Sequence, residues 1–553
     1  MPKYDYEKYF PFSRIREEQR KAIEFALDSY ESGKRVVMLD MGTGCGKSAT
    51  AVTIARYVAN HLPSSFDEEG MPLAGAYILT TQKILQQQYL DDFGPGVGKS
   101  KNLMLSIKSS SNYKCGFYPD QTCAESRRVI SQLGKKISGT EFQKHCRGHC
   151  PYGKDKQEFI DSPISVTNFS YFFAETIYGK KLKPRDFLII DECHNTESEL
   201  GKFVEVSFSE KFAKEVVKCK IPTDLSSQDK IFKWIQTSYK SSVTKYFKNI
   251  EKLIASQLSE NSSGLGDLGK QYEMLDKHIH KLERFLEVYN PNNWIVNVAN
   301  PDPQKKKSMR RFEFKPVDVS RYSEDNLFKF GQRILMLSAT IIDKHVFCAS
   351  VGLPVDEVAY LSIPSPFPIE SRPIHYIPVG SMSMSMIDKS LPILAEAVQM
   401  LLERHSDVKG MIHCVNFKIS QYLAEKIKSD RILTHTSENR EEVLTTHLKS
   451  DKPTVLISPS MMEGVDLSDD ASRFQIMCKI PFPYLGDQVV KKRMENNRMW
   501  YNYQTAKSII QAIGRSIRNE SDYATTYILD SDWERFFRTS SHMFPLDFKK
   551  TLI

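Results

Sequence analysis

The 553-residue chain lacks any run of about 18 apolar residues, which argues against a membrane-spanning helix. Its first residues also lack the apolar stretch of a secretory signal peptide. Internal repeats and long low-complexity tracts are missing as well, which argues against a repeat architecture. We therefore expect no membrane association and a cytoplasmic or nucleoid-associated location, or a nuclear one in a eukaryote.

Neither sign of charge is in large excess. The chain has 76 Lys and Arg against 68 Asp and Glu, a net charge of +8, and 41% of its residues are hydrophobic. These proportions are typical of a globular protein with large cores, and the length suggests about three to four domains. The excess is uneven, because residues 99–160 hold twelve Lys and Arg against five Asp and Glu. Such a basic stretch suits a phosphate backbone, although a merely solvated surface is the alternative.

Cysteine is sparse, yet four of the ten cysteines fall within 36 residues: Cys115, Cys123, Cys146 and Cys150. In an intracellular protein such a cluster is more typical of metal ligands than of disulfides. Thiolates suit both iron–sulfur clusters and Zn²⁺, and the neighbouring His145 and His149 leave a mixed Cys/His zinc site open.

A strand, a glycine-rich loop and a helix follow one another near the N-terminus. Val36–Leu39 is a short apolar run typical of a buried parallel strand, and Ala49–Ala59 is helix-like. In the loop between them, glycines let backbone N–H groups face phosphates, Lys47 adds positive charge, and Ser48 offers a hydroxyl to Mg²⁺. The pattern predicts an ATP phosphate site formed by Gly42, Thr43, Gly44, Cys45, Gly46, Lys47 and Ser48.

A second buried strand, Phe187–Ile190, ends in the carboxylate pair Asp191 and Glu192. At the carboxyl end of a parallel strand, Asp191 can hold Mg²⁺ and Glu192 can polarise the attacking water. The pair therefore predicts the hydrolytic half of the ATP site.

A second α/β unit is expected from about residue 370. Val408–His413 and Pro453–Ser458 have the composition of buried strands, and Ile509–Arg518 has that of a helix. Arg515 and Arg518 are three residues apart, which predicts that both lie on one face of that helix. Arginines of a second lobe that reach the γ-phosphate stabilise transition-state charge.

Taken in order, these segments resemble the motifs of superfamily 2 helicases, and within them the iron–sulfur branch that contains XPD and DinG. The matching segments are Arg16–Gln19, Met41–Ser48, Ile78–Gln82, Asp191–His194, Leu337–Thr340, Ser365–Phe367, Ser460–Asp466 and Gln511–Arg518. The resemblance implies an α/β fold with two RecA-like parallel-sheet motor lobes. It also implies an Fe–S cluster insertion and a mostly helical Arch-like insertion in the first lobe.

The resemblance further implies a division of the chain and a role for each matched residue. Residues 1–100, 164–204 and 326–368 would form the first lobe and its linker, 101–163 the Fe–S domain, 205–325 the Arch-like insertion and 369–553 the second lobe. The implied catalytic residues are Lys47, Asp191, Glu192, Arg515 and Arg518. Arg16 and Gln19 would read the adenine side, and Asp466 and Gln511 would line the cleft between the lobes.

The four clustered cysteines would hold a [4Fe–4S] cluster, with zinc as the alternative metal. Thr80, Gln82 and Lys83 near the third motif would contact the DNA backbone. The cysteine segment also contains aromatic and basic residues, which can stack on bases and neutralise phosphates. We therefore expect further DNA contacts at Tyr113, Tyr118 and Arg127.

The function implied is an ATP-dependent helicase that moves 5′→3′ on single-stranded DNA and parts the duplex with its cluster domain. Two alternatives stay open: a translocase that strips proteins or RNA from DNA, and a DNA-structure sensor gated by ATP. The expected partners are single-stranded and forked DNA, bound by a monomeric motor that uses ATP and Mg²⁺.

Overall fold

The computed structural model describes residues 3–62, 73–94, 104–117, 120, 122–126, 148–259, 265–299, 309–461, 467, 469–519 and 521–553. The predictions at Tyr118, Arg127, Cys146 and Asp466 lie outside the described residues. Within these ranges, no helix has both the length and the apolar character needed to cross a membrane.

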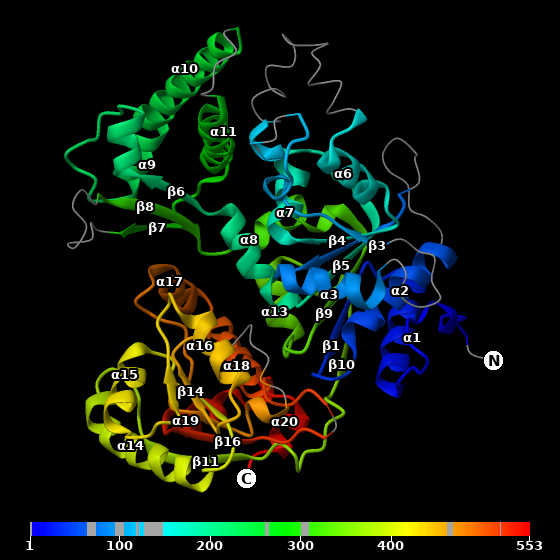
Figure 1. Cartoon of the computed structure of the whole chain (residues 1–553), viewed down its shortest axis with the longest axis vertical. Helices are drawn as coiled ribbons and strands as arrows, with labels where there is room; N and C mark the ends of the chain where they lie inside the picture. The colour runs from blue at the N-terminus through cyan, green and yellow to red at the C-terminus, as the bar shows by residue number, and fades with distance from the viewer. Residues whose placement is uncertain are drawn as a thin grey trace.

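The first lobe is built on a seven-stranded sheet in the order β10-β1-β9-β5-β2-β4-β3, in which neighbouring strands run parallel (Figure 1). The strands are β1 (Val36–Met41), β2 (Ala76–Thr80), β3 (Met104–Ser106), β4 (Ile164–Asn168), β5 (Arg185–Asp191), β9 (Gly331–Ser338) and β10 (Val358–Ile363). Both predicted strands of this lobe, β1 and β5, are therefore present. The edge strand β3 belongs to this sheet although it falls within residues 101–163.

Alternate residues of β1 pack against helices on opposite faces of the sheet. Val37 and Leu39 join a buried cluster with α1 (Glu17–Glu31) and α2 (Lys47–His61). Val36 and Met38 face the other way, toward the cluster that contains α7 (Phe169–Phe173), α8 (Thr196–Val204) and α13 (Lys344–Val351). Burial on both faces explains the apolar run Val36–Leu39, and the one polar residue of the strand, Asp40, is buried with hydrogen-bond partners.

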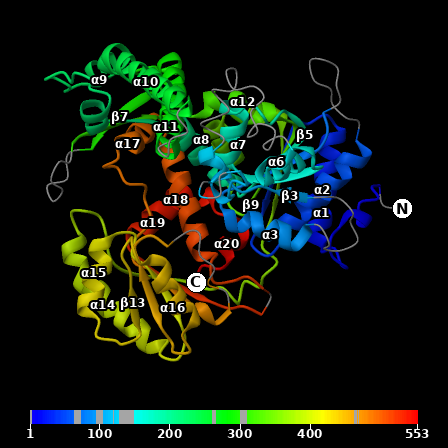
Figure 2. The ribbon, with the colours of Figure 1, turned by 45° about the horizontal axis from the view of Figure 1, so that its top comes forward.

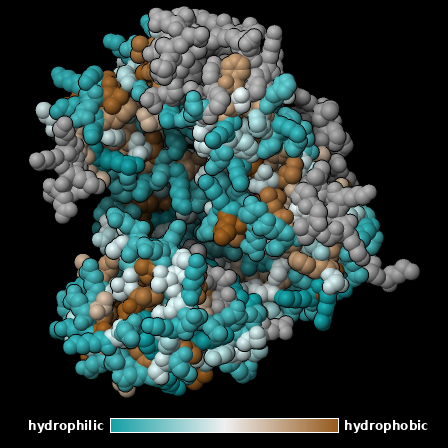
Figure 3. Space-filling view, viewed as in Figure 1, coloured by the Kyte–Doolittle hydropathy of each residue, from teal (hydrophilic) through white to brown (hydrophobic). Residues whose placement is uncertain are grey.

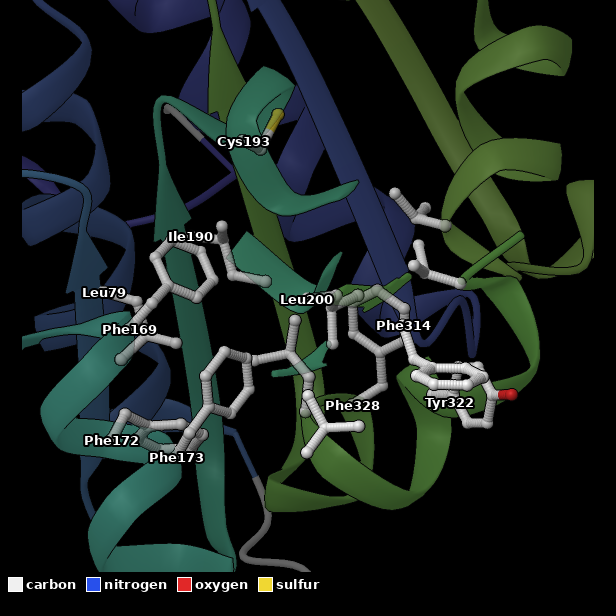
Figure 4. Close-up of a cluster of buried hydrophobic side chains, with 14 of the residues drawn as sticks. Leu79, Phe169, Phe172, Phe173, Ile190, Cys193, Leu200, Phe314, Tyr322 and Phe328 are labelled. Atoms are coloured by element: carbon white, nitrogen blue, oxygen red, sulfur yellow. The ribbon is translucent and has the colours of Figure 1, made fainter. Parts of the chain in front are cut away.

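The second face carries an aromatic core that extends beyond the motor lobe. Figure 4 shows Phe169 of α7 beside Ile190, Phe172 and Phe173 of the same helix in the lower part of the cluster, and Leu200 of α8 close to Phe328 and Phe314. Phe314 belongs to the Arch-like insertion, so the same continuous core ties that insertion to the first lobe.

The second lobe contains a six-stranded parallel sheet in the order β11-β16-β15-β12-β14-β13. Its strands are β11 (Ile374–Gly380), β12 (Gly410–His413), β13 (Ile432–Thr434), β14 (Val455–Ser458), β15 (Phe474–Met477) and β16 (Thr525–Asp530). The predicted strands are confirmed as β12 and β14. Its helices are α14 (Ile387–Arg404), α15 (Phe417–Lys426), α16 (Arg440–Lys449), α17 (Gln488–Asn496), α18 (Arg498–Ile513), α19 (Asp532–Ser540) and α20 (Leu546–Lys550).

The Arch-like insertion is helical as predicted, but it also contains a small antiparallel sheet that the sequence analysis missed. The helices are α9 (Gln228–Trp234), α10 (Lys240–Ser259) and α11 (Leu265–Val288), and the strands, in the order β6-β8-β7, are β6 (Val206–Ser209), β7 (Trp294–Ala299) and β8 (Arg311–Pro316). Phe208 and Phe314 point inward from this sheet, where they pack on Tyr239 at 5.2 Å and on Phe285 at 4.9 Å between ring centroids. Buried and partly exposed residues alternate along β6 and β8, which is the signature of a half-buried strand. The strands are short, however, and β6 lies about a hundred residues before β8 in the sequence.

The insertion and the second lobe stand on the same side of the first lobe. Figure 3 shows the surface hollowed between them, with mostly hydrophilic side chains around the hollow. Figure 2, viewed from a second direction, likewise places α17 beneath the insertion.

Arg185, the first residue of β5, joins three segments of the first lobe. Its buried guanidinium donates to the carbonyls of Ala76 and Ser162 at 2.9 and 3.0 Å and to the Ser165 hydroxyl at 2.9 Å. It also lies 4.3 Å from the centroid of the Tyr77 ring. This buried cation therefore links β5 to β2 and to the chain that leads into β4.

We predict that Arg185→Met lowers the free energy of unfolding by about 2–4 kcal/mol, because buried acceptors lose their donor. Thermal and urea denaturation would measure the change. Arg20→Met is the control, since the ion pair of Arg20 with Glu7 is exposed and its loss is worth about 0–1 kcal/mol. Equal stability of the two variants would contradict the prediction.

Candidate functional site

A cavity of about 950 Å³ lies between the two lobes. It opens at the edge where the parallel strands of the first sheet end, which is the edge at which open α/β sheets bind ligands. The predicted ATP-site residues that line it are Arg16, Gln19, Gly42, Thr43, Gly44, Gly46, Lys47, Ser48, Asp191, Glu192, Gln511, Arg515 and Arg518. The structure thus brings together residues from opposite ends of the chain.

The glycine loop connects β1 to α2 and packs against the chain that leads out of β10. Gly44 and Gly46 have φ angles of 87° and 72°, in the left-handed region that favours glycine. A Cβ atom at Gly44 would lie 2.2 Å from the ring of Phe367. The Ser365 hydroxyl donates to the carbonyl of Thr43 at 3.0 Å. Ser365 and Phe367 therefore hold the phosphate loop in its conformation.

Helix α2 begins at Lys47, so its first backbone N–H groups face the cavity and carry the positive end of the helix dipole. Cys45 lies inside the loop but does not line the cavity. Its thiol donates to the carbonyl of Pro364 at 3.4 Å, and burial raises the pKa of Cys45 to about 11. Cys45 is a packing residue of the loop rather than a group that faces a ligand.

Arg16 and Gln19 contact the loop at the start of α1. The Arg16 guanidinium donates to the carbonyl of Gly44 at 2.5 Å, and the backbone N–H of Arg16 donates to the Gln19 side chain at 2.9 Å. The Gln19 amide nitrogen lies 3.4 Å from the carbonyl of Gly46, to which it donates. Both residues thus link α1 to the phosphate loop while they line the cavity.

The carboxylate pair lies at the end of β5. Asp191 accepts hydrogen bonds from the Tyr89 hydroxyl and from the backbone N–H of Glu192, both at 2.9 Å. Burial and the negative charge of Glu192 raise the pKa of Asp191. Glu192 has a φ of 49°, which is unusual for a residue with a side chain. Burial alone would raise the pKa of Glu192, but a hydrogen bond from His194 and the positive charge of Lys47 outweigh it and hold that pKa low.

A row of hydrogen-bonding side chains runs from the carboxylate pair to the second lobe. His194 Nδ1 lies 2.8 Å from Ser338 Oγ, which lies 3.3 Å from Thr340 Oγ1. Gln511 of α18 donates to Thr340 Oγ1 at 3.1 Å. The sequence motifs contain all four residues, but their connection into one row is visible only in the structure.

The prediction that Arg515 and Arg518 share a helix face is wrong. Helix α18 ends at Ile513, and both arginines follow it in a loop. Gly514 caps the helix, and Asp522 accepts the backbone N–H of Arg518 at 2.9 Å, which holds the chain in a non-helical course. Both arginines nevertheless line the cavity, so the loop brings them to the place that the helix was expected to reach.

Three of the four clustered cysteines are described. Cys115, Cys123 and Cys150 are buried in the same core, and the sulfur atoms of Cys123 and Cys150 lie 3.8 Å apart. Among the described side chains, no group of three or more His, Cys, Asp or Glu could hold a metal ion. Cys146 lies outside that part of the chain, so the metal stays a prediction.

The expected DNA contacts differ in accessibility. Thr80 is fully buried and its hydroxyl donates to the carbonyl of Gln82 at 3.2 Å, so a DNA contact by the Thr80 side chain is at odds with the structure. Gln82 and Lys83 are exposed at the start of α3 (Lys83–Phe93), although Gln82 also lines the cavity. Tyr113 is half-buried and packs edge-on against Tyr152 at 5.2 Å, which favours a packing role.

Part of the cavity wall is formed by residues that were not predicted from the sequence. Arg372 and Asp547 both line it and form an ion pair at 3.0 Å. No local motif marks either residue, because they come together only through the packing of α20 on the second lobe.

Two family models match the chain. The model of the helicase C-terminal domain matches residues 399–549, and that of the type III restriction enzyme res subunit matches residues 12–249. The two matched stretches contain, respectively, the arginine loop and the phosphate loop with the carboxylate pair.

Relatives and solved structures give a consistent result. The ATP-dependent DNA helicase YoaA of Escherichia coli is 22% identical over 95% of this chain and 92% of its own length. The ATP-dependent DNA helicase DinG of Photobacterium profundum is 26% identical over 39% of this chain and 34% of its own. A solved structure titled XPD helicase superposes with a TM-score of 0.61 at 16% identity, covering 96% of this chain and 99% of that one, and so shows the fold. The ordered motifs, their arrangement around one cavity and the helicases among the relatives together support a superfamily 2 helicase similar to XPD and DinG.

Proposed function

We propose that this protein hydrolyses Mg-ATP between its lobes, moves 5′→3′ along single-stranded DNA and separates the strands of a duplex. The observation that carries the proposal is the shared cavity, in which one lobe supplies the phosphate loop and the carboxylates and the other supplies the arginines. When the two halves of a site lie on separate lobes, hydrolysis depends on how the lobes are placed. ATP turnover can then change the position of one lobe against the other and drive stepping.

The residues around the cavity fit a magnesium nucleotide. The N-terminus of α2 and Lys47 would bind the β- and γ-phosphates, while Ser48 and Asp191 would hold Mg²⁺, which supplies positive charge for the phosphates. Glu192 stays ionised at neutral pH because its pKa is low, so it can accept the hydrogen bond of the attacking water. The Oε1 atom of Gln511 is buried and has no hydrogen-bond partner among the described residues, so it is an acceptor left for a donor in the cleft.

The second lobe would complete the site with positive charge. Arg515 and Arg518 would stabilise the charge that develops on the transferred phosphoryl group. Arg16 and Gln19 would contact the adenine side, and Asp466 would line the cleft beside Gln511.

The cysteine segment would form a metal-stapled module that parts the duplex. Cys115, Cys123, Cys146 and Cys150 would hold a [4Fe–4S] cluster, with zinc as the alternative, and the bound metal would tie together a module of only about 60 residues. The burial of the three described cysteines supports such a site. The excess of basic residues in 99–160 supports contact with DNA, to which Gln82, Lys83, Tyr118 and Arg127 would contribute.

We propose the same division of the chain as above, into two motor lobes, a cluster domain and an Arch-like insertion. We also treat the protein as a monomeric motor on single-stranded or forked DNA. The hydrophilic hollow between the insertion and the second lobe in Figure 3 is of the kind that a polyanion can occupy.

We predict that Lys47→Ala and Glu192→Gln each lower DNA-stimulated ATP turnover by more than about 100-fold, because they remove a phosphate ligand and the catalytic carboxylate. Steady-state phosphate release measures turnover, and fluorescence anisotropy measures binding to single-stranded DNA, which should change little. Lys21→Ala, on the exposed face of α1, is the matched lysine control. Turnover retained in either active-site variant would contradict the assigned site.

We predict that the protein, purified without oxygen, unwinds a fork with only a 5′ tail and leaves the matched fork with only a 3′ tail intact. Strand separation with Mg-ATP is followed by gel or by fluorescence. Unwinding from the 3′ tail would contradict the polarity. ATP turnover without unwinding of either fork would favour the translocase or the sensor.

We predict that Cys146→Ser loses the bound metal and the unwinding activity but keeps much of the ATPase, because the cavity residues belong to the two lobes. Iron, acid-labile sulfide and zinc contents identify the metal and decide between the two alternatives. Cys219→Ser is the control, since Cys219 is a buried cysteine of the Arch-like insertion and should not affect metal content. Full unfolding of Cys146→Ser would show that the module is part of the core.

A further inference from the structure

Helix α18 faces the first lobe with a row of hydrogen-bonding side chains. Trp500, Gln504, Lys507 and Gln511 recur at intervals of four, three and four residues, which places them on one side of a helix. Figures 1 and 2 both show α18 on the side of the second lobe that is turned toward the first. The row ends at Gln511, next to the cavity.

Three donors of the second lobe converge on one carboxylate of the first. Trp500 Nε1 lies 3.1 Å from both oxygens of Glu197, and Gln504 Nε2 donates to the same carboxylate at 3.1 Å. Arg493 of α17 forms an ion pair with Glu197 at 2.5 Å. The Glu197 side chain is only 14% exposed, so these contacts are shielded from solvent. A buried carboxylate with three donors holds two helices in a defined relative position far better than a single exposed ion pair does.

Arg493 is itself held in place from two sides. Its guanidinium lies 4.5 Å from the centroid of the Trp500 ring and donates to the carbonyl of Val317 at 2.9 Å. The ring and the carbonyl restrict the guanidinium to the orientation that meets Glu197. Glu197, Arg493 and Trp500 therefore form an ordered cluster rather than an isolated ion pair on the surface.

Glu197 follows the carboxylate pair closely in the chain. It lies in the first turn of α8, five residues after Glu192, where a negative charge is favoured by the helix dipole. Lys507 donates to the carbonyl of His194 at 3.4 Å, so α18 also contacts the segment between them. A shift of this segment thus moves Glu197 and the start of α18 together.

The other end of α18 leads to the proposed arginine finger. From Trp500 to Ile513 the helix is about 20 Å long at 1.5 Å per residue, and a helix of this length moves as a rod. It ends at Ile513, and Arg515 follows two residues later at the cavity. Holding the first half of α18 therefore contributes to the position of the loop that carries Arg515.

We propose that Glu197 is a positioning residue for ATP hydrolysis: it clamps α18 against the first lobe and so holds Arg515 at the nucleotide. The inference rests on the proposed function, in which Arg515 stabilises the transition state. Glu197 touches no substrate and acts only through α18. It thereby links the segment that carries Glu192 to the opposite wall of the site.

The first experiment compares Glu197→Gln with Glu199→Gln in the full-length protein. Glu199 lies on the same helix, but its ion pair at 2.7 Å is with Lys202 of that helix. We expect Glu197→Gln to lower kcat for DNA-stimulated ATP hydrolysis about tenfold while KM for ATP changes less than about threefold, because a transition-state contact is lost. Glu199→Gln should change neither. An unchanged kcat in Glu197→Gln, or the same loss in both variants, would overturn the proposal.

A double-mutant cycle with Arg515→Ala tests whether Glu197 acts through the arginine. If it does, Glu197→Gln lowers kcat by less than about twofold once Arg515 has been removed, because effects along one route do not add. Full additivity would overturn the inference and leave the proposed function standing. If Arg515→Ala alone leaves kcat unchanged, the proposed role of Arg515 in ATP hydrolysis is contradicted. That result differs from full additivity, so the experiment separates failure of the proposed function from failure of the inference about Glu197.

A second variant covers the case in which Glu197→Gln does not fold. Trp500→Phe keeps the aromatic ring beside Arg493 but removes the N–H donor to Glu197. It should lower kcat by about two- to fivefold at unchanged KM and lose that effect in the Arg515→Ala background. A wild-type kcat in Trp500→Phe would count against the proposal.

Discussion

The parallel register of β1, β9 and β5 is the constraint on which the rest of the structure depends. Asp40 of β1 is opposite Ser338 of β9, whose neighbour Leu337 is opposite Asp191 of β5. Because the three strands run in one direction, the segments that follow them emerge side by side at one edge of the sheet. The phosphate loop, the Ser338–Thr340 turn and the carboxylate pair meet there for that reason alone.

Buried polar groups keep this edge in place. Asp40 accepts the backbone N–H groups of Ile341 and Ile342 at 3.2 and 3.0 Å and the Tyr360 hydroxyl at 3.0 Å, and burial raises its pKa. The carboxylate of β1 thus fixes the chain that leaves β9, and β10 contributes through Tyr360. Partners this numerous make the edge rigid, so the second lobe meets a prepared surface rather than a mobile one.

The contact between the lobes has a polar part and an apolar part. Polar side chains of α17 and α18 contact the Glu192–Glu197 stretch and Thr340. Tyr503, Ala506 and Ile509 of α18 join the buried apolar cluster that contains α8 and α13 of the first lobe. The polar contacts can be broken and remade without exposing a core, whereas the apolar contacts of α18 hold the lobes together.

The sequence alone determined the strands and loops that carry chemistry. The apolar runs of β1 and β5, the glycines with left-handed φ angles and the terminal Asp191–Glu192 pair are local features, and local sterics and hydrogen bonding specify them. Tertiary structure alone decided what depends on contacts between distant segments. It buried Thr80, paired β6 with β8 about a hundred residues away, and brought Glu197 to Trp500. No local pattern specifies such contacts, because each needs a partner whose position is set by the packing of the whole chain.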